Sequence, residues 1–111
     1  APDSHDSDPM PVDVAYVEID PLTVSLRAPS TSKHLVFRAS LEVAPSAQEE
    51  VRKLLPRVTD VLNSYLRALD PKDFEDASAL TRLRAQMLRR VQVVVGSGKV
   101  NDLLIMEFVL S

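Results

Sequence analysis

The chain has 111 residues, of which 45% are hydrophobic and 26% are charged, and its net charge is −3. These values are ordinary for one globular domain with its own core, and they supply no general attraction to nucleic acid or anionic lipid. The absence of cysteine excludes disulfides, thiol nucleophiles and thiolate metal sites, and no stretch approaches the about 18 apolar residues of a membrane-spanning helix.

Residues 1–13 are rich in Asp and Pro and contain few apolar residues. Such a segment cannot bury enough surface to offset the entropy of ordering it, so we expect a flexible acidic linker. Because the chain begins at Ala1 rather than Met, we interpret it as a processed or truncated piece whose membrane anchor would lie upstream. His5 lies here without further ligands and does not predict a metal site.

Two strands are predicted in residues 14–44. In the first strand, apolar residues alternate up to Ile19 and again from Leu22. Because Pro21 has no N–H for a strand ladder, it predicts a bulge or an edge position, and a bulge would return all these apolar side chains to one face. Residues 33–44 alternate strictly, which is typical of a half-buried strand, and the two strands are expected to form an antiparallel hairpin.

Residues 46–69 place apolar side chains at intervals of three and four, which predicts an amphipathic helix that covers the sheet. Ser46 followed by Glu49 matches a capping box at the helix start. Pro56 removes a backbone hydrogen bond inside this segment and bends a helix axis. We therefore expect either one kinked helix or a short piece followed by a longer helix that begins near Pro56.

Asp70 followed by Pro71 is typical of a short helical turn, with Phe74 beneath it as part of the core. A second long helix is predicted over residues 77–94 and ends at Gly96. Four arginines lie on this helix, but no aromatic platform is interleaved with them and the domain is acidic overall. A solvated face or a polar contact with a protein is therefore favoured over nucleic-acid binding. The four residues are Arg82, Arg84, Arg89 and Arg90.

The last predicted strand, residues 100–110, is apolar on both faces. A strand of this kind is usually central in its sheet and covered on both sides, so its second cover is expected from another subunit. A place in the domain's own core would equally account for these side chains. Strict alternation assigns one face to Leu104, Met106, Phe108 and Leu110, and the other to Leu103, Ile105 and Val109.

Together these elements predict one α+β domain over residues 14–111, with the order β-β-α-α-β. Its sheet is small and mainly antiparallel, and two long helices cover it. Glu18 and Glu42 are able to face each other across the hairpin, but solvated strand charges are far commoner than catalytic pairs. We therefore expect no enzyme activity, and we assign no catalytic, cofactor-binding or metal-ligating residue.

The order of the elements and several local phrases resemble the periplasmic domain of the flagellar basal body-associated FliL family. The resemblance covers roughly residues 14–111. It departs from the family pattern at Leu22, at Val24-Ser25 and at Ile105-Met106, where the family often has other residues. The phrases that carry it are 16–26 (YVEIDPLTVSL), 34–43 (HLVFRASLEV), 55–62 (LPRVTDVL) and 100–110, with the ending Glu107-Phe108-Val109.

The resemblance implies a stomatin-core-like fold in the periplasm, held to the inner membrane of a bacterium by an N-terminal helix that precedes the linker. It implies a non-catalytic scaffold that forms a homo-oligomeric ring around the stator's B subunit, contacts basal-body components and supports torque and motility. No cofactor and no nucleic-acid partner is expected. The alternative is a diverged stomatin-like interaction domain that serves a membrane complex other than the flagellum.

Two surfaces are predicted to contact other copies or partners. The first is the less sheltered side of the last strand, and the second is the arginine face of the second long helix. The residues of the first are Leu103, Ile105 and Val109, and those of the second are Arg82, Arg84, Arg89 and Arg90.

Overall fold

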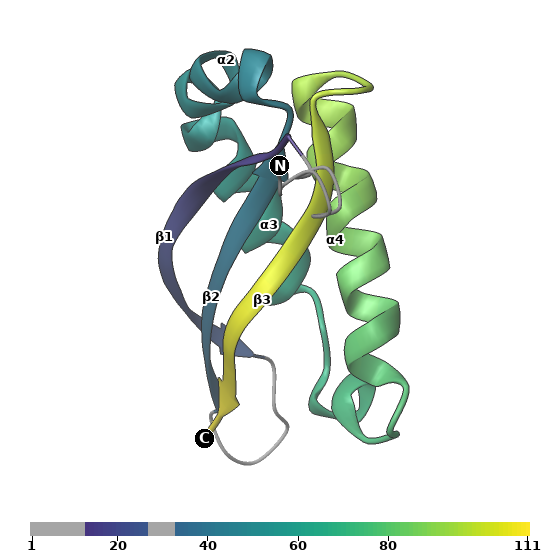
Figure 1. The fold of residues 1–111 in the computed structure, drawn as a ribbon. Helices are drawn as coiled ribbons and strands as arrows, with labels where there is room; N and C mark the ends of the chain where they lie inside the picture. The colour runs from purple at the N-terminus through teal and green to yellow at the C-terminus, as the bar shows by residue number, and fades with distance from the viewer. Residues whose placement is uncertain (1–12, 27–32) are drawn as a thin grey trace, which may run out of the picture.

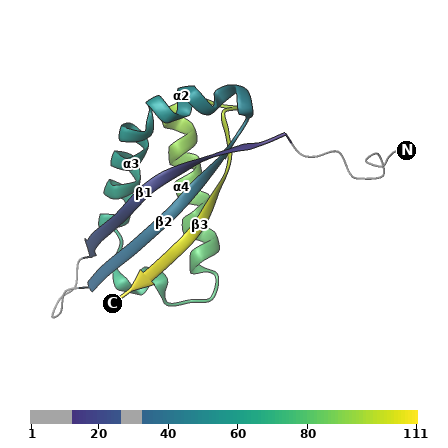
Figure 2. The ribbon, with the colours of Figure 1, turned by 60° about the vertical axis from the view of Figure 1, so that its left-hand side comes forward.

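The computed structural model describes residues 13–26 and 33–111 of the chain, so the predicted linker lies almost wholly outside the described residues. Three antiparallel strands form one sheet in the order β1-β2-β3, and α3 and α4 cover one face of it (Figures 1 and 2). This confirms the α+β fold and the order β-β-α-α-β. The elements are β1 (Ala15–Leu26), β2 (Lys33–Val43), η1 (Pro45–Ala47), α2 (Gln48–Lys53), α3 (Leu55–Arg67), η2 (Pro71–Phe74), α4 (Ala79–Val95) and β3 (Val100–Leu110).

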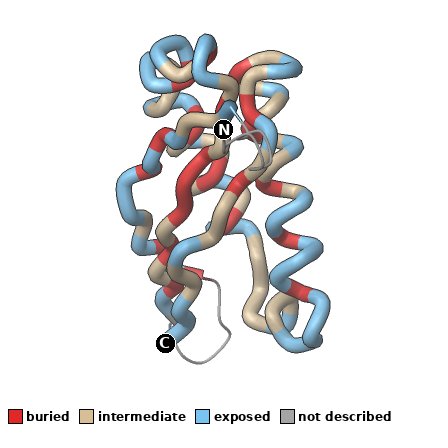
Figure 3. The backbone as a smooth tube through the Cα atoms, viewed as in Figure 1, coloured by how far each residue is buried: buried red, intermediate tan, exposed pale blue. Residues whose placement is uncertain are grey.

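The central strand, β2, carries the middle of the hydrophobic core. Its inward side chains point at the helices and are almost completely buried, whereas the alternate residues face the other side of the sheet. Figure 3 shows this concentration of buried residues where the strands meet the helical layer. The inward residues are Leu35, Phe37, Ala39, Leu41 and Val43.

The predicted bulge in β1 is confirmed. Ile19 pairs with Ala39 and Leu22 pairs with Phe37, so Asp20 and Pro21 together stand opposite one residue of β2. The extra residue changes the parity of the strand and keeps its apolar side chains on the helical side. The buried residues of β1 are Val17, Ile19, Val24 and Leu26, and Leu22 packs against the same core.

The predicted long helix is divided at Pro56 into a short piece and a longer helix, which confirms the second of the two expected arrangements. α2 ends at Lys53 and α3 begins at Leu55, with Leu54 between them. Pro56 then lies in the first turn of α3. Backbone N–H groups in the first turn have no intrahelical acceptor, so the lack of an N–H in proline costs no hydrogen bond there. The division lets α2 cross the end of the sheet, and α3 buries Val58, Leu62 and Leu66.

The capping box predicted at Ser46 and Glu49 is wrong. Ser46 lies inside η1, and Ala47 is the N-cap of α2 without a side-chain hydrogen bond. The helical turn starts earlier because Pro45 holds a helical φ at its first position. A capping box does form at η2, where Asp70 and Asp73 each accept a bond from the backbone of the other.

α4 ends as predicted at Gly96, whose φ of 97° is readily reached only by glycine. Leu80, an apolar residue in the first turn of α4, is 44% exposed. α4 diverges from β3 toward its N-terminal end (Figure 1), which leaves Leu80 without a covering layer. The residues that α4 buries are Ala79, Leu83, Met87, Val91 and Val95.

The expectation that β3 is a central, two-faced strand is wrong. β3 lies at the edge of the sheet and pairs only with β2. Two register shifts leave Asn101 and Met106 as extra residues on β3, and each shift exchanges the faces that strict alternation assigns. The side chains opposite the inward residues of β2 are Val100, Leu103, Ile105, Phe108 and Leu110, and those on the other face are Asp102, Leu104, Glu107 and Val109.

Among the described residues, no helix combines the length and the apolar character needed to cross a bilayer.

Two methionines provide a matched test of this core. Met87 on α4 is fully buried, whereas Met106 at the β3 bulge is 56% exposed. We expect Met87→Ala to lower the free energy of unfolding by about 2–5 kcal/mol, because it removes buried contacts and leaves a cavity. Met106→Ala should change it by less than about 0.5 kcal/mol. Urea unfolding of both variants checks this, and similar losses for the two would contradict the assignment of the core.

Candidate interaction surface

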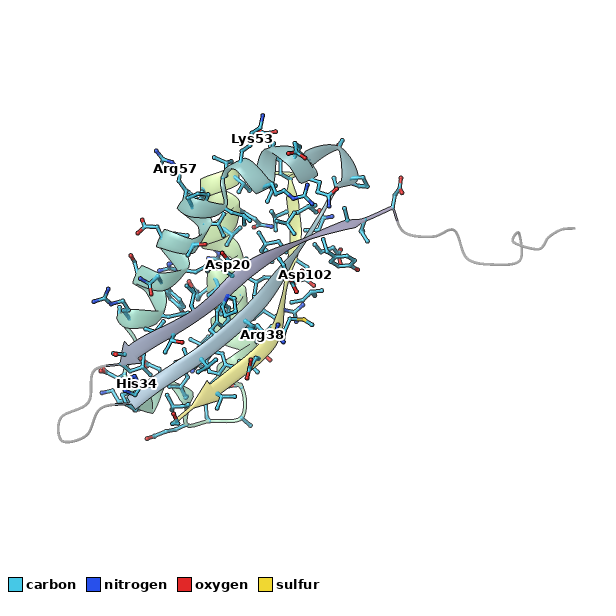
Figure 4. The ribbon with its side chains drawn as sticks, turned by 90° about the vertical axis from the view of Figure 1, so that its left-hand side faces the viewer. Asp20, His34, Arg38, Lys53, Arg57 and Asp102 are labelled. Carbon is cyan, nitrogen blue, oxygen red and sulfur yellow. The ribbon has the colours of Figure 1, made fainter. Side chains whose placement is uncertain are left out.

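The face of the sheet opposite the helices is open to solvent, and we call it the outer face. Figure 4 looks onto it, with Arg38 near its middle. Arg38 Nε lies 3.0 Å from Glu107 Oε1, and the two residues are cross-strand neighbours. Both side chains are 41% exposed, so this pair contributes only about 0.2–1 kcal/mol. The outer face consists of Tyr16, Glu18, Thr23, Ser25, His34, Val36, Arg38, Ser40, Glu42, Asp102, Leu104, Glu107 and Val109.

Exposed apolar side chains lie on and beside the outer face. Tyr16, Met106 and Val109 are each about half exposed. Tyr16 lies at the start of β1, whereas Met106 and Val109 lie on β3. Two of these three large apolar side chains therefore gather along the edge strand rather than across the sheet.

The structure separates the three strand residues that were predicted to share a surface. Leu103 is fully buried in the core, and Ile105 is partly buried against the same core. Only Val109 remains on the outer face, with 48% of its side chain exposed. The bulge at Met106 causes this separation because it reverses the parity between Ile105 and Val109.

The four arginines of α4 do not form one surface either. Arg84 lies on the side of the helix next to β3, where Nε donates to the Leu103 carbonyl at 2.9 Å and Nη2 lies 2.6 Å from Asp102 Oδ2. Arg82 lies 3.7 Å from Asp76 in the segment before α4. These two side chains fasten α4 to the elements on either side of it in the chain.

Arg90 lies on the opposite border of the helix and packs on α3. Its guanidinium carbon is 4.4 Å from the centre of the Tyr65 ring, and Nη1 donates to Gln86 Oε1 at 2.9 Å. Burial raises the pKa of the Tyr65 phenol, and the positive charge of Arg90 partly offsets this rise. The ring therefore stays neutral at physiological pH, where a stacked cation is worth about 0.5–1 kcal/mol.

Arg89 is the arginine of α4 that remains available to a partner. Its side chain is exposed, and the described residues 13–26 and 33–111 give it no hydrogen bond or salt bridge. Of the four predicted arginines, one is therefore a surface cation and three are held within the domain.

The described residues contain no group of three or more His, Cys, Asp or Glu side chains that could hold a metal ion. Glu18 pairs with Ser40, and Glu42 pairs with Tyr16. The two carboxylates are therefore diagonal rather than direct neighbours on the outer face.

An apolar hollow beside β3 was missed from the sequence. It lies between η2, the N-terminal half of α4 and the end of β3, and its volume is about 280 Å³. Phe74 lies on one side of it, with its ring centre 5.5 Å from that of Phe108. The side chains that line the hollow are Phe74, Asp76, Ala77, Ala79, Leu80, Leu83, Phe108 and Leu110.

A signal for this arrangement is present in the sequence. Leu103, Ile105, Phe108 and Leu110 follow one another at spacings of two, three and two. An interval of three inside a strand indicates an extra residue, as Pro21 does in β1. Without a proline to mark it, this interval is hard to distinguish from plain alternation in the sequence.

The profile of the family described as flagellar basal body-associated protein FliL matches residues 16–110 of the chain. Two curated relatives, the flagellar FliL proteins of Caulobacter vibrioides strains NA1000 / CB15N and ATCC 19089 / CIP 103742 / CB 15, are each 29% identical over 103 residues. These alignments cover 91% of this chain and 50% of each relative, so the chain spans about half the length of the curated relatives it matches. The match spans all three strands and all the helices, and the chain belongs to the FliL family of flagellar basal body-associated proteins.

Proposed function

We propose that this domain is a non-catalytic scaffold of the bacterial flagellar motor. In this proposal it associates with copies of itself around the stator units and supports torque generation and motility. Membership of the FliL family gives it a flagellar motor-associated role. The observation that carries the finer proposal is the edge strand β3. Its exposed apolar side chains lie beside a backbone edge that no other strand of the described residues pairs with.

A scaffold needs surfaces rather than reactive groups, and the described residues offer such surfaces. Solvent-exposed apolar side chains on β3 provide area for a contact whose energy comes from removing them from water. Arg89 adds a cation on another side of the domain, which would favour an acidic partner. Leu103 and Ile105 belong to the hydrophobic core, so in this proposal they support β3 from within and do not contact the partner.

In the proposed periplasmic setting, a linker of residues 1–13 leads from the membrane to β1. The start of β1 lies at the end of the domain where α2 crosses the sheet, and β3 finishes at the opposite end (Figures 1 and 2). The hollow at η2 and the last residues of β3 would therefore face away from the membrane, where neighbouring domains and stator components can reach them.

Crosslinking in the native flagellated cell tests the proposed role directly. The intact membrane-anchored protein is crosslinked, isolated and analysed by mass spectrometry. We expect stator subunits together with crosslinks between copies of this chain.

Two other outcomes would each remove part of the proposal. Self-crosslinks without any motor component would keep the assembly and discard the stator as its partner, which favours the alternative of a non-flagellar membrane complex. The absence of both would contradict the scaffold function itself. A cell that lacks the stator genes provides the control for nonspecific recovery.

Two arginine variants separate a partner contact from a structural one. Arg84→Glu should lower the melting temperature by several degrees, because the loss of the bond to the Leu103 carbonyl costs about 1–3 kcal/mol. Arg89→Glu should leave stability within about 0.5 kcal/mol of the wild type and weaken stator recovery in the pull-down. Thermal unfolding and the crosslinking assay measure these effects. If the Arg89→Glu variant still recovers the stator fully, Arg89 is not part of the proposed contact surface.

A further inference from the structure

The two faces of the domain carry opposite charges. Figure 2 shows the sheet on one side and α3 and α4 on the other. On the helical side, α3 and α4 together carry six arginines and one acidic residue, Asp60. On the outer face, Arg38 is the one arginine among several carboxylates. The carboxylates belong to Glu18, Glu42, Asp102 and Glu107.

The carboxylates concentrate at the end of the sheet near α2, and we call Glu18, Glu42 and Asp102 the acidic half of the outer face. Glu42 lies directly opposite Asp102, and like charges in that position repel each other. Arg84 lies 2.6 Å from Asp102 at the border with α4. Within residues 13–26 and 33–111, no cation forms a salt bridge with Glu18 or Glu42. The acidic half would therefore gain from a cation that another molecule supplies.

The side of α4 that faces away from the core is exposed along its length, and we call it the α4 stripe. Its residues follow one another at intervals of three and four, opposite the buried side chains of the helix. Val93 is the most exposed large apolar side chain of the described residues, at 80%. The stripe therefore combines cations with apolar surface that the domain leaves in water. It consists of Arg82, Ala85, Arg89 and Val93.

Two hydrogen bonds fix the level of the α4 stripe along the domain. Gln92 Nε2 donates to the Val100 carbonyl at 3.0 Å, and Arg84 Nε donates to the Leu103 carbonyl at 2.9 Å. Arg89 lies between these two donors in α4. Its level along the long axis of the domain is therefore between those of Val100 and Leu103.

The carboxylates of the acidic half lie at this same level, on the opposite side of the domain. Asp102 precedes Leu103 in β3, and Glu42 is its neighbour in β2. A ring axis parallel to the long axis of the domain carries each copy sideways without changing its level. Such an axis brings Arg89 of one copy to the carboxylates of the next. It also leaves the start of every β1 on the same side, as attachment to one membrane requires.

We propose that the α4 stripe of one copy packs on the acidic half of the outer face of the next copy, with Arg89 beside Glu42 and Asp102. Each copy then uses its helical side toward one neighbour and its sheet toward the other. A head-to-tail contact of this kind forms a ring of many copies when its rotation closes. The proposal rests on the self-association in the proposed function and names the two surfaces that make it.

Charge complementarity is the reason for choosing a second copy as the occupant. The basic and acidic surfaces belong to the same chain and lie at the same level, so each copy offers what its neighbour lacks. Many copies held at one place in a membrane also reach a high effective concentration. Apolar contact adds to the attraction, because Tyr16 pairs with Glu42 at this level and is 51% exposed. The exposed Val93 of the next copy would lie near it, out of water.

Reversal of the two charges tests the contact. The intact protein in its native membrane is linked to itself with an amine-directed reagent, which neither substitution affects. Arg89→Glu or Glu42→Arg alone should reduce the linked product about tenfold, because repulsion replaces attraction. Both substitutions in one chain should restore most of it, since opposite charges then meet again. The melting temperature should stay unchanged, because neither side chain is buried.

Arg67→Glu is the matched control for the swap. Arg67 is also an exposed helical arginine, but it lies at the end of α3, beside Ser25 at the other end of the sheet. Combined with Glu42→Arg it should not restore the linked product. The proposed contact is overturned if the single reversals leave the yield unchanged, or if the Arg89–Glu42 swap restores no more than the control. Loss of stator recovery without loss of self-linking in Glu42→Arg would instead assign the acidic half to a basic stator surface.

A pair of cysteines tests whether the contact is head-to-tail. Residues 1–111 contain no cysteine, and the sheet and its core separate Tyr16 from Val93 within one copy. With Tyr16→Cys and Val93→Cys together, a short thiol-directed crosslinker should give dimers, trimers and larger products. Each substitution alone should give far less. A product that stops at dimers would indicate a two-fold contact and overturn the proposal.

The unsubstituted protein separates this proposal from the proposed function. If its copies are linked through their amines but neither the charge swap nor the cysteine pair behaves as expected, the scaffold stands and the contact between α4 and the outer face is wrong. If the amine-directed reagent links no two copies, self-association itself is wrong.

Discussion

The strict alternation of β2 is the constraint on which the rest of the structure depends. Its inward residues are completely or almost completely buried, and each of them pairs with a residue of β1 and of β3. Because side chains alternate with a period of two, both neighbours have to match the parity of β2 or expose their apolar residues. Each neighbour departs from regular spacing, and each corrects the departure with a bulge.

The sequence predicted the parts of the fold that residue chemistry marks locally. Pro21 marked the bulge in β1, and Pro56 marked the division between α2 and α3, because proline lacks the donor that each ladder requires. The alternation of β2 was equally direct. The bulges in β3 carry no proline or glycine, so the parity of that strand is decided by its partner rather than by its own residues.

The candidate surface was predicted less well than the fold, for a related reason. Arginines on a helix look equivalent in a sequence, but their roles depend on what the helix packs against. Arg84 meets the edge of β3, and Arg90 meets the Tyr65 ring. Neither neighbour is visible from the spacing of the arginines themselves. Among the described residues, Arg89 and the exposed apolar side chains of β3 are surface features that the domain's own contacts do not use.

The protected edge at Pro21 also determines how far any assembly through strands can grow. A sheet with two open edges adds subunits without limit, since every addition regenerates the same open edge. Here the edge formed by β1 is bent by its bulge and lacks a donor at Pro21, so another strand adds to that edge less readily. In the assembly proposed above, where many copies would lie close together, the protected β1 edge limits the growth of fibres through strand addition, and Pro21 contributes to that protection.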